Sequence, residues 1–243
     1  MRQINHLSIN KNDVYAMCKT KNYIIMNNNY EGLKVYNNKL VFITDIKISN
    51  DFVIYQIYGS LLNDIIVMID EENQKQYIIK IKENGTEIKT ISQNLVFSSY
   101  YYIERENFVL RNYDTTFKFS LYDGREVERF TCEPKIICSN FQDEILFIED
   151  ELIFYENSNL KKRMLFQNDI MSRYVVYKQI IVRYTENEIF IYNHFNLQDK
   201  IVFNQSVCIA NVSFGINSLF VLLYDKGFIL RNEIREYTFE NRP

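Results

Sequence analysis

The amino-acid sequence predicts an all-β protein built from repeats of short antiparallel strands. Aromatic residues, 19 Tyr and 18 Phe but no Trp, make up 15% of the chain, and such side chains favour pleated, half-buried strands. Only two Pro and six Gly are present. Asn and Asp, which tolerate left-handed backbone geometry, are therefore expected to build most of the turns. The third observation is the regular recurrence of one strand-like segment.

Six short segments with alternating apolar residues start 35 to 44 residues apart along the chain. They cover residues 32–36, 76–80, 116–120, 151–155, 188–192 and 227–231. Repeats of about 40 residues made of short strands are typical of β-propellers. The sequence therefore predicts a six-bladed β-propeller of four-stranded antiparallel blades. A two-sheet sandwich is the structural alternative, because alternation alone does not distinguish the two.

The continuous repeat favours one domain over residues 1–243, with four strands per blade counted outward from the axis. The blades are expected at about residues 13–46, 47–92, 93–132, 133–167, 168–204 and 205–240. The recurring segments are the third strands, and alternate apolar side chains such as Leu152 and Phe154 would fill the space between blades.

The other strands follow from the same alternation, and each blade is read in chain order. The first two blades have expected strands at 14–18, 23–26, 32–36 and 40–44, then at 52–58, 64–69, 76–82 and 87–91. The third and fourth have them at 95–98, 108–112, 116–121 and 125–131, then at 135–139, 144–148, 151–155 and 162–166. The last two have them at 174–178, 180–184, 188–192 and 200–203, then at 208–214, 219–224, 227–231 and 234–239.

Two segments fit this layout less simply. Residues 100–103, which include three consecutive Tyr, are expected to be a long connection between the first two strands of the third blade. Residues 4–9 also alternate, and we expect them to close the fold by pairing beside residues 234–239, because an exposed sheet edge invites aggregation. A flexible N-terminal tail is the rival interpretation.

No motif of a particular propeller family is present. A Trp-Asp dipeptide is excluded by the absence of Trp, and neither a paired-glycine kelch signature nor a repeated Ser-x-Asp-x-Gly box occurs. The chain therefore resembles the six-bladed β-propeller superfold rather than a named family, and the fold alone assigns no activity.

Composition narrows the function classes. The formal net charge of −3 argues against a basic nucleic-acid binder. The polar N-terminus has no apolar signal region, and no run approaches the roughly 20 apolar residues of a membrane span. Four cysteines are too few and too scattered for a disulfide framework. We therefore expect a cytoplasmic protein that binds neither nucleic acid nor membrane.

The sequence gives no catalytic or metal constellation. Cys18, Cys138 and Cys208 fall on expected first strands, where small side chains suit a crowded axis, so packing is favoured over zinc binding. His6 and His194 are not placed to assist a nucleophile, and no glycine-rich phosphate loop occurs. We expect a non-enzyme without metal or cofactor. Polar residues that face an axial pocket would be the alternative, and the candidates are Gln56, Ser98, Ser139, Lys178 and Asn211.

Carboxylates recur at the turns between the second and third strands. These candidate partner-binding residues are Glu31, Glu71, Glu72, Asp114, Glu149, Asp150, Glu151, Glu186, Glu188 and Asp225. If they converge on one end, they create a negative potential that steers a basic partner. Solubility of the hairpin tips is the plainer interpretation.

The sequence thus favours a protein-binding propeller. Its most specific form is an immunity-type inhibitor that occludes a basic toxin or nuclease with its acidic turns. A scaffold for several proteins and an enzyme or small-ligand binder at the axis are the alternatives.

Overall fold

A computed structural model describes the chain as β-strands and turns. The described residues are 1–10, 13–48, 53–70, 75–91, 100–104, 106–112, 115–131, 135–140, 143–148, 151–156, 159–165, 173–177, 180–226 and 231–239. Their 24 strands form six four-stranded antiparallel sheets. The predicted all-β class and the propeller arrangement of four-stranded antiparallel blades are confirmed. The described residues contain no helix that is long and apolar enough to span a bilayer.

The chain divides into two compact units, each with three sheets. Unit 1 combines Met1–Asn94 with Phe203–Pro243, and unit 2 is Leu95–Val202. The prediction of one continuous domain stays a prediction.

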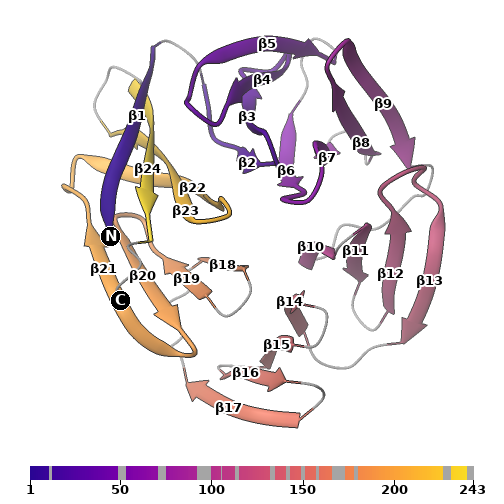
Figure 1. The fold of residues 1–243 in the computed structure, drawn as a ribbon, viewed down its shortest axis with the longest axis vertical. Helices are drawn as coiled ribbons and strands as arrows, with labels where there is room; N and C mark the ends of the chain where they lie inside the picture. The colour runs from indigo at the N-terminus through magenta and orange to yellow at the C-terminus, as the bar shows by residue number, and fades with distance from the viewer. Residues whose placement is uncertain are drawn as a thin grey trace. The chain divides into compact units, whose positions relative to one another are not determined.

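Unit 1 contains the sheets formed by the first and last parts of the chain (Figure 1). Its first sheet has β2 (Met17–Lys19), β3 (Tyr23–Asn28), β4 (Gly32–Asn37) and β5 (Phe42–Lys47). The second has β6 (Ile54–Gly59), β7 (Ile65–Asp70), β8 (Lys75–Lys82) and β9 (Gly85–Ile91). The third runs in the order β22 (Val207–Phe214), β23 (Ser218–Asp225), β24 (Arg231–Thr238) and β1 (Arg2–Asn10).

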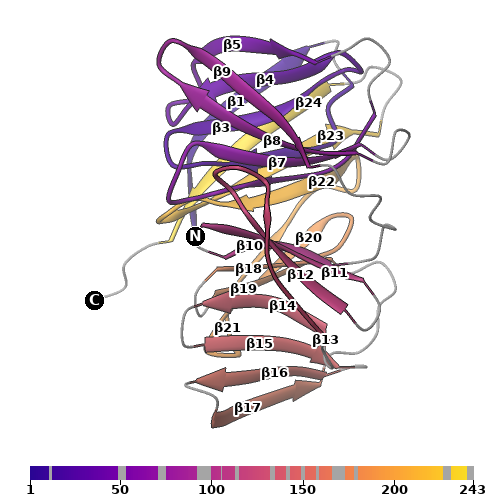
Figure 2. The same ribbon diagram turned by 90° about the vertical axis from the view of Figure 1, so that its right-hand side faces the viewer.

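Unit 2 repeats the plan with twelve consecutive strands (Figure 2). Its first sheet has β10 (Tyr100–Glu104), β11 (Asn107–Asn112), β12 (Thr115–Ser120) and β13 (Glu126–Thr131). The second has β14 (Lys135–Asn140), β15 (Asp143–Ile148), β16 (Glu151–Glu156) and β17 (Asn159–Leu165). The third has β18 (Arg173–Tyr177), β19 (Ile180–Tyr184), β20 (Glu188–Asn193) and β21 (Asn196–Val202).

Neighbouring sheets meet through their first strands. In unit 1, β2 contacts both β6 and β22, and in unit 2, β14 contacts both β10 and β18. The backbone N–H of Lys19 donates to Ser213 Oγ at 3.1 Å, and a Cβ on Gly59 would lie 2.1 Å from the Lys19 carbonyl oxygen. Only glycine permits so close a backbone approach. Because β2, β6 and β22 all end at this point, the first strands of unit 1 run in the same direction.

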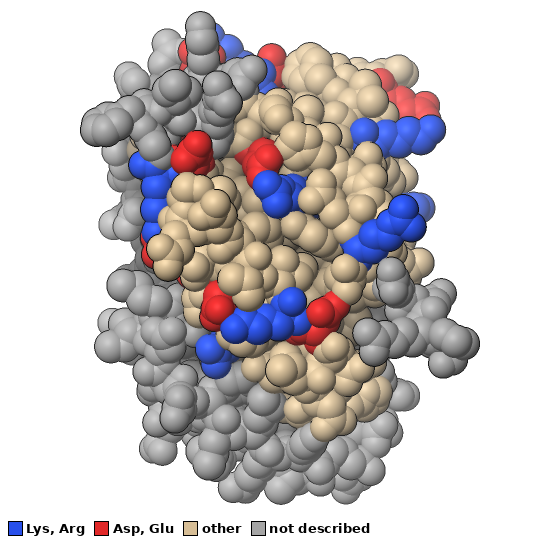
Figure 3. Space-filling model, turned by 90° about the vertical axis from the view of Figure 1, so that its left-hand side faces the viewer, with Lys and Arg blue, Asp and Glu red and all other residues tan. Residues whose placement is uncertain are grey.

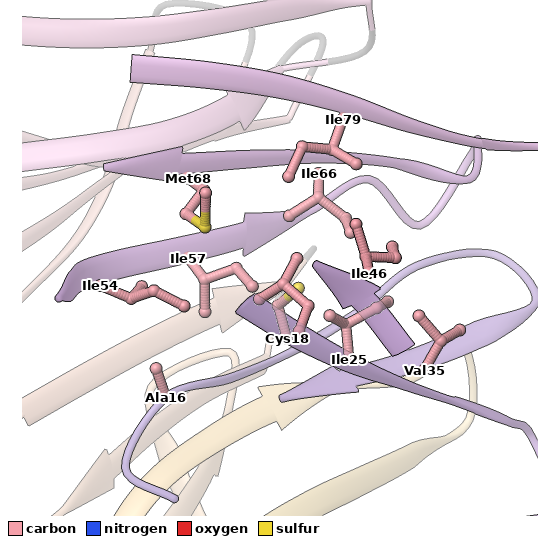
Figure 4. Close-up of a cluster of buried hydrophobic side chains, with 11 residues drawn as sticks. Ala16, Cys18, Ile25, Val35, Ile46, Ile54, Ile57, Ile66, Met68 and Ile79 are labelled. Carbon is pink, nitrogen blue, oxygen red and sulfur yellow. The ribbon is translucent and has the colours of Figure 1, made fainter. Parts of the chain in front are cut away.

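Apolar side chains fill the space between adjacent sheets of unit 1. Between the first two sheets, Ile25, Val35, Ile66, Met68 and Ile79 are fully buried, and Figure 4 shows them with Ala16, Cys18, Ile46, Ile54 and Ile57. Burial of each large aliphatic side chain contributes about 1.5–3 kcal/mol. The alternation that predicted the strands therefore also forms the core between them.

The sixth sheet corrects one predicted strand and confirms another. The segment expected as its third strand, 227–231, lies outside the described residues except for Arg231. The third position belongs to β24, because its residue Ile234 aligns with Leu222 of β23 on one side and with Leu7 of β1 on the other. β24 was expected as a fourth strand, and the fourth position is taken by β1. Five sheets thus consist of four consecutive strands, while the sixth has three and is completed by the predicted N-terminal pairing.

The third blade holds a second correction. The expected first strand, residues 95–98, lies outside the described residues. The observed first strand is β10, Tyr100–Glu104, which pairs with β11 from Tyr100↔Arg111 to Glu104↔Asn107. Its three Tyr were wrongly interpreted as a connection. Aromatic side chains have high β-propensity, so these residues form the first strand although the repeat spacing placed that strand further upstream.

The closing strand should contribute to stability through its most buried side chain, Ile9. Ile9 is 6% exposed and packs with Phe220 and Ile234 against the first sheet. We expect Ile9→Ala to lower the free energy of unfolding by about 2–5 kcal/mol, measured by urea denaturation. Ile4, on the same strand but 51% exposed, is the matched control, and Ile4→Ala should cost less than about 0.5 kcal/mol. Equal effects of the two variants would show that β1 does not pack as described.

Candidate functional site

The described structure places four of the ten candidate carboxylates with their side chains. Glu31 lies in the β3–β4 turn, Glu186 lies in the β19–β20 turn, Glu188 begins β20 and Asp225 ends β23. Glu151 begins β16, and only its backbone is described. The other five, Glu71, Glu72, Asp114, Glu149 and Asp150, lie outside the described residues. Every described position is at a junction of second and third strands, as the sequence predicted.

In unit 1 these junctions share one end of the sheets. The first strands β2, β6 and β22 run in the same direction, so the turns after each second strand all lie at the end where the first strands begin. Glu31 and Asp225 therefore belong to the same end of neighbouring sheets. Whether the acids of unit 2 join them stays a prediction.

Glu31 stands beside an ordered group of polar side chains. Tyr30 is 43% exposed, and its hydroxyl donates to Asp13 Oδ2 at 2.8 Å. This hydrogen bond raises the pKa of Tyr30. Glu31 is exposed and, among the described residues, has no ion-pair partner. We call Asp13, Tyr30 and Glu31 the Tyr30 patch.

Asn27 holds the backbone beneath this patch. It is fully buried, and its Oδ1 accepts hydrogen bonds from the backbone N–H groups of Tyr15 and Ala16 at 2.8 and 2.9 Å. Its Nδ2 donates to the Asp13 carbonyl oxygen at 2.6 Å. The Asn29 side chain adds an acceptor for the Asp13 N–H at 2.7 Å. One amide side chain thus fixes the segment before β2 against the β3–β4 hairpin.

Glu188 has a different setting. Its carboxylate pairs with Lys200 on β21 at 2.8 Å, and the ammonium of Lys200 also lies 4.8 Å from the ring centre of Phe190. Arg183 contacts the same ring at 4.7 Å. Glu188 therefore belongs to a charge-aromatic cluster on the surface of its sheet, whereas Glu186 is exposed in the turn.

Several acids outside these turns pair with cations. Ion pairs on the third and fourth strands of the sheets join Lys34 to Asp45, Lys118 to Glu128 and Arg235 to Glu233. On the side of the molecule shown in Figure 3, acidic and basic side chains lie next to one another. The described residues on this side therefore do not form a uniformly acidic surface.

A buried lysine at the opposite end of unit 1 was missed by the sequence analysis. Lys19 is 6% exposed, and its ammonium donates to the carbonyl oxygens of Thr20 and, at 3.1 Å, of Lys21. Burial lowers its pKa to about 8, and nearby Asp64 and Glu236 partly oppose the shift. A lysine that ends the apolar run of residues 16–18 was the available signal.

Asp64 joins this lysine to the adjoining turns. Its Oδ1 accepts hydrogen bonds from Thr20 Oγ1 at 3.0 Å and from the Asn22 N–H at 2.8 Å, and its Oδ2 accepts one from Asn22 Nδ2 at 2.7 Å. These contacts connect the β2–β3 turn to the β6–β7 turn. Because Lys19 already donates to two carbonyl groups, its role is to satisfy buried backbone acceptors.

The remaining sequence candidates have structural settings. Cys18 and Cys208 are buried cysteines that form no disulfide, and burial raises the pKa of Cys18. The described residues contain no group of three His, Cys, Asp or Glu arranged for a metal. Gln56 accepts a hydrogen bond from Tyr58, and Asn211 is half-buried on β22. Ser98, Lys178 and the side chain of Ser139 lie outside the described part.

The comparisons with known proteins bear on the fold alone. No protein-family model and no curated protein matches the sequence. The structure is similar to a solved structure of Kluyveromyces lactis Hsv2, described as having a complete loop 6CD, with a TM-score of 0.51 and 11% sequence identity. The match covers 88% of this chain and 73% of that chain.

Lys19 should make stability depend on pH. Its pKa is about 8 when folded and about 10.5 when unfolded, so the unfolded chain holds more protons between these values and stability rises with pH there. Below pH 8 the cost of the buried ammonium is fully present. We expect Lys19→Met to remove this rise. Between about pH 8 and 10 the melting temperature of the wild type should therefore increase by a few degrees relative to that of the variant. Lys21→Met, at the exposed next lysine along the chain, is the control, and parallel curves for Lys19→Met would contradict the assignment.

Proposed function

We propose that this protein is a non-enzymatic binding propeller that recognises a basic protein through the turns between its second and third strands. The Tyr30 patch is the observation that carries the proposal. It combines an exposed aromatic ring, a carboxylate without an ion-pair partner among the described residues, and a second carboxylate held by a hydrogen bond.

The patch has the physical properties of a preorganised contact. Asn27 fixes the backbone on both sides of it, so little conformational entropy remains to be lost on binding. Tyr buries a large area with few rotatable bonds and is enriched at energetically dominant interface positions. Carboxylates beside it favour a cationic partner and raise the rate of encounter.

The wider form of the proposal adds the other acids of the turns between second and third strands. These acids, which would supply further carboxylates to the partner, are Glu71, Glu72, Asp114, Glu149, Asp150, Glu151, Glu186 and Asp225. A group of carboxylates fits a surface that itself binds phosphate groups, such as the active site of a nuclease. We therefore propose an immunity-type inhibitor as the specific function, with a scaffold for several proteins as the broader one.

Binding to the product of the adjacent gene would test this proposal. We expect Tyr30→Ala to weaken the complex more than tenfold and Glu31→Lys to weaken it several-fold, measured by titration calorimetry. Affinity should fall between about 50 and 500 mM salt, because the charges are exposed and screened.

Unit 2 supplies a matched control. The Tyr122 hydroxyl donates to Glu106 Oε1 at 2.8 Å, and Tyr122 is 45% exposed. Glu106 lies between the first and second strands of its sheet and Tyr122 between the third and fourth, so neither is at a turn between second and third strands. Tyr122→Ala and Glu106→Lys should leave the affinity unchanged. Salt-insensitive binding, or an equal loss in these controls, would contradict an acidic binding end.

A further inference from the structure

The outer edges of the sheets differ in one respect. In the described registers, the outermost strand of five sheets carries one extra residue opposite its neighbour. These extra residues are Ile4, Ile43, Val127, Lys161 and Gln198. Such bulges twist a strand and hinder pairing with another chain. Over its described length β9 has none, because its register with β8 runs without a shift from Gly85↔Lys82 to Ile91↔Gln76.

The direction of the free backbone groups on β9 follows from its neighbours. The N–H of Ile81 donates to the Asp64 carbonyl oxygen at 2.9 Å, toward β7. Because successive residues of a strand point to opposite sides, Lys80 and Ile78 direct their backbone groups toward β9, where they face Glu87 and Lys89. The backbone N–H and C=O groups of Thr86, Ile88 and Thr90 therefore point along the outer edge.

The sequence of this edge is complementary to itself. Residues 86–90 read Thr-Glu-Ile-Lys-Thr. In an antiparallel pair of two copies with Ile88 opposite Ile88, Glu87 faces Lys89 of the other copy and Thr86 faces Thr90. The outward groups of residues 86, 88 and 90 then meet as hydrogen-bonded pairs, since these recur at every second residue. Moving the register by two residues would place Glu opposite Glu or Lys opposite Lys, which is unfavourable.

The side chains on both faces of β9 suit this pairing. Ile88 is 41% exposed although its partner Ile79 on β8 is fully buried, so a second Ile88 would cover part of it. On the other face Glu87 is an ionised acceptor, because Lys82 and Lys89 lower its pKa to about 2. Its ion pair with Lys89 at 3.3 Å is exposed and is worth little to the isolated chain. Replacing this ion pair with one between Glu87 and the Lys89 of another copy therefore costs little free energy.

We propose that β9 pairs antiparallel with β9 of a second copy and joins two sheets across a two-fold axis through Ile88. The contact is isologous, as closed dimers require. A single pair of strand edges buries less area than a standard interface, so the dimer is weak and depends on concentration.

Charge reversal tests the pairing and its register. Sedimentation velocity over a concentration series should show dimer formation by wild type. We expect Glu87→Lys and Lys89→Glu each to weaken the dimer at least tenfold, because each places like charges opposite one another twice. The double variant restores opposite charges and should return to within about threefold of wild type. Asp45→Lys is the control, since it breaks a similar exposed ion pair, with Lys34, on the bulged strand β5.

A disulfide provides an independent measurement. Residues in a hydrogen-bonded antiparallel pair have Cα atoms about 5.5 Å apart, within the range of a disulfide. Mild oxidation should therefore link Ile88→Cys into a covalent dimer but leave Ile43→Cys, at the bulge of β5, monomeric. A wild type that stays monomeric up to about 1 mM, or a double charge reversal that fails to restore the dimer, would overturn the proposal.

Discussion

The packing of each narrow sheet against its neighbour is the interaction on which the rest of the structure depends. A four-stranded sheet of this length exposes apolar side chains on both faces, and it becomes stable only when an adjacent sheet covers them. In unit 1 this requirement brings β2, β6 and β22 so close that Gly59 has no room for a Cβ beside the Lys19 carbonyl oxygen. The same proximity buries the Lys19 ammonium, which must then find partners among nearby carbonyl groups.

Most strands could be predicted because burial imposes alternation on the sequence. Predicted and observed strands agree closely where a short run of apolar and aromatic residues lies between polar turns, as in β16 and in β19, Ile180–Tyr184. The errors arose where spacing was trusted over pairing. Residues 227–231 continue the repeat in sequence, yet hydrogen bonding assigns the third position of that sheet to β24. The Tyr-rich β10 was missed because the expected length of the unit suggested a strand further upstream.

The site could be predicted only in outline. The turn positions of Glu31, Glu186, Glu188 and Asp225 follow from the strand order, so sequence reasoning reached them. What surrounds each acid depends on contacts between distant residues, such as the pairing of Glu188 with Lys200. The amide of Asn27 and the ammonium of Lys19 are similar cases. Each is polar and buried because particular backbone groups need it, and a single sequence does not display that need.

The pairing of β1 with β24 also has a consequence for the order of events during synthesis. Leu7 aligns with Ile234, so β1 leaves the ribosome long before β24, the strand with which it pairs. Until then the inward side chains of β1 have no partner strand, while the consecutive strands of other sheets can pair as they emerge. The nascent chain therefore leaves these inward side chains of β1 uncovered while the residues between β1 and β24 are synthesised.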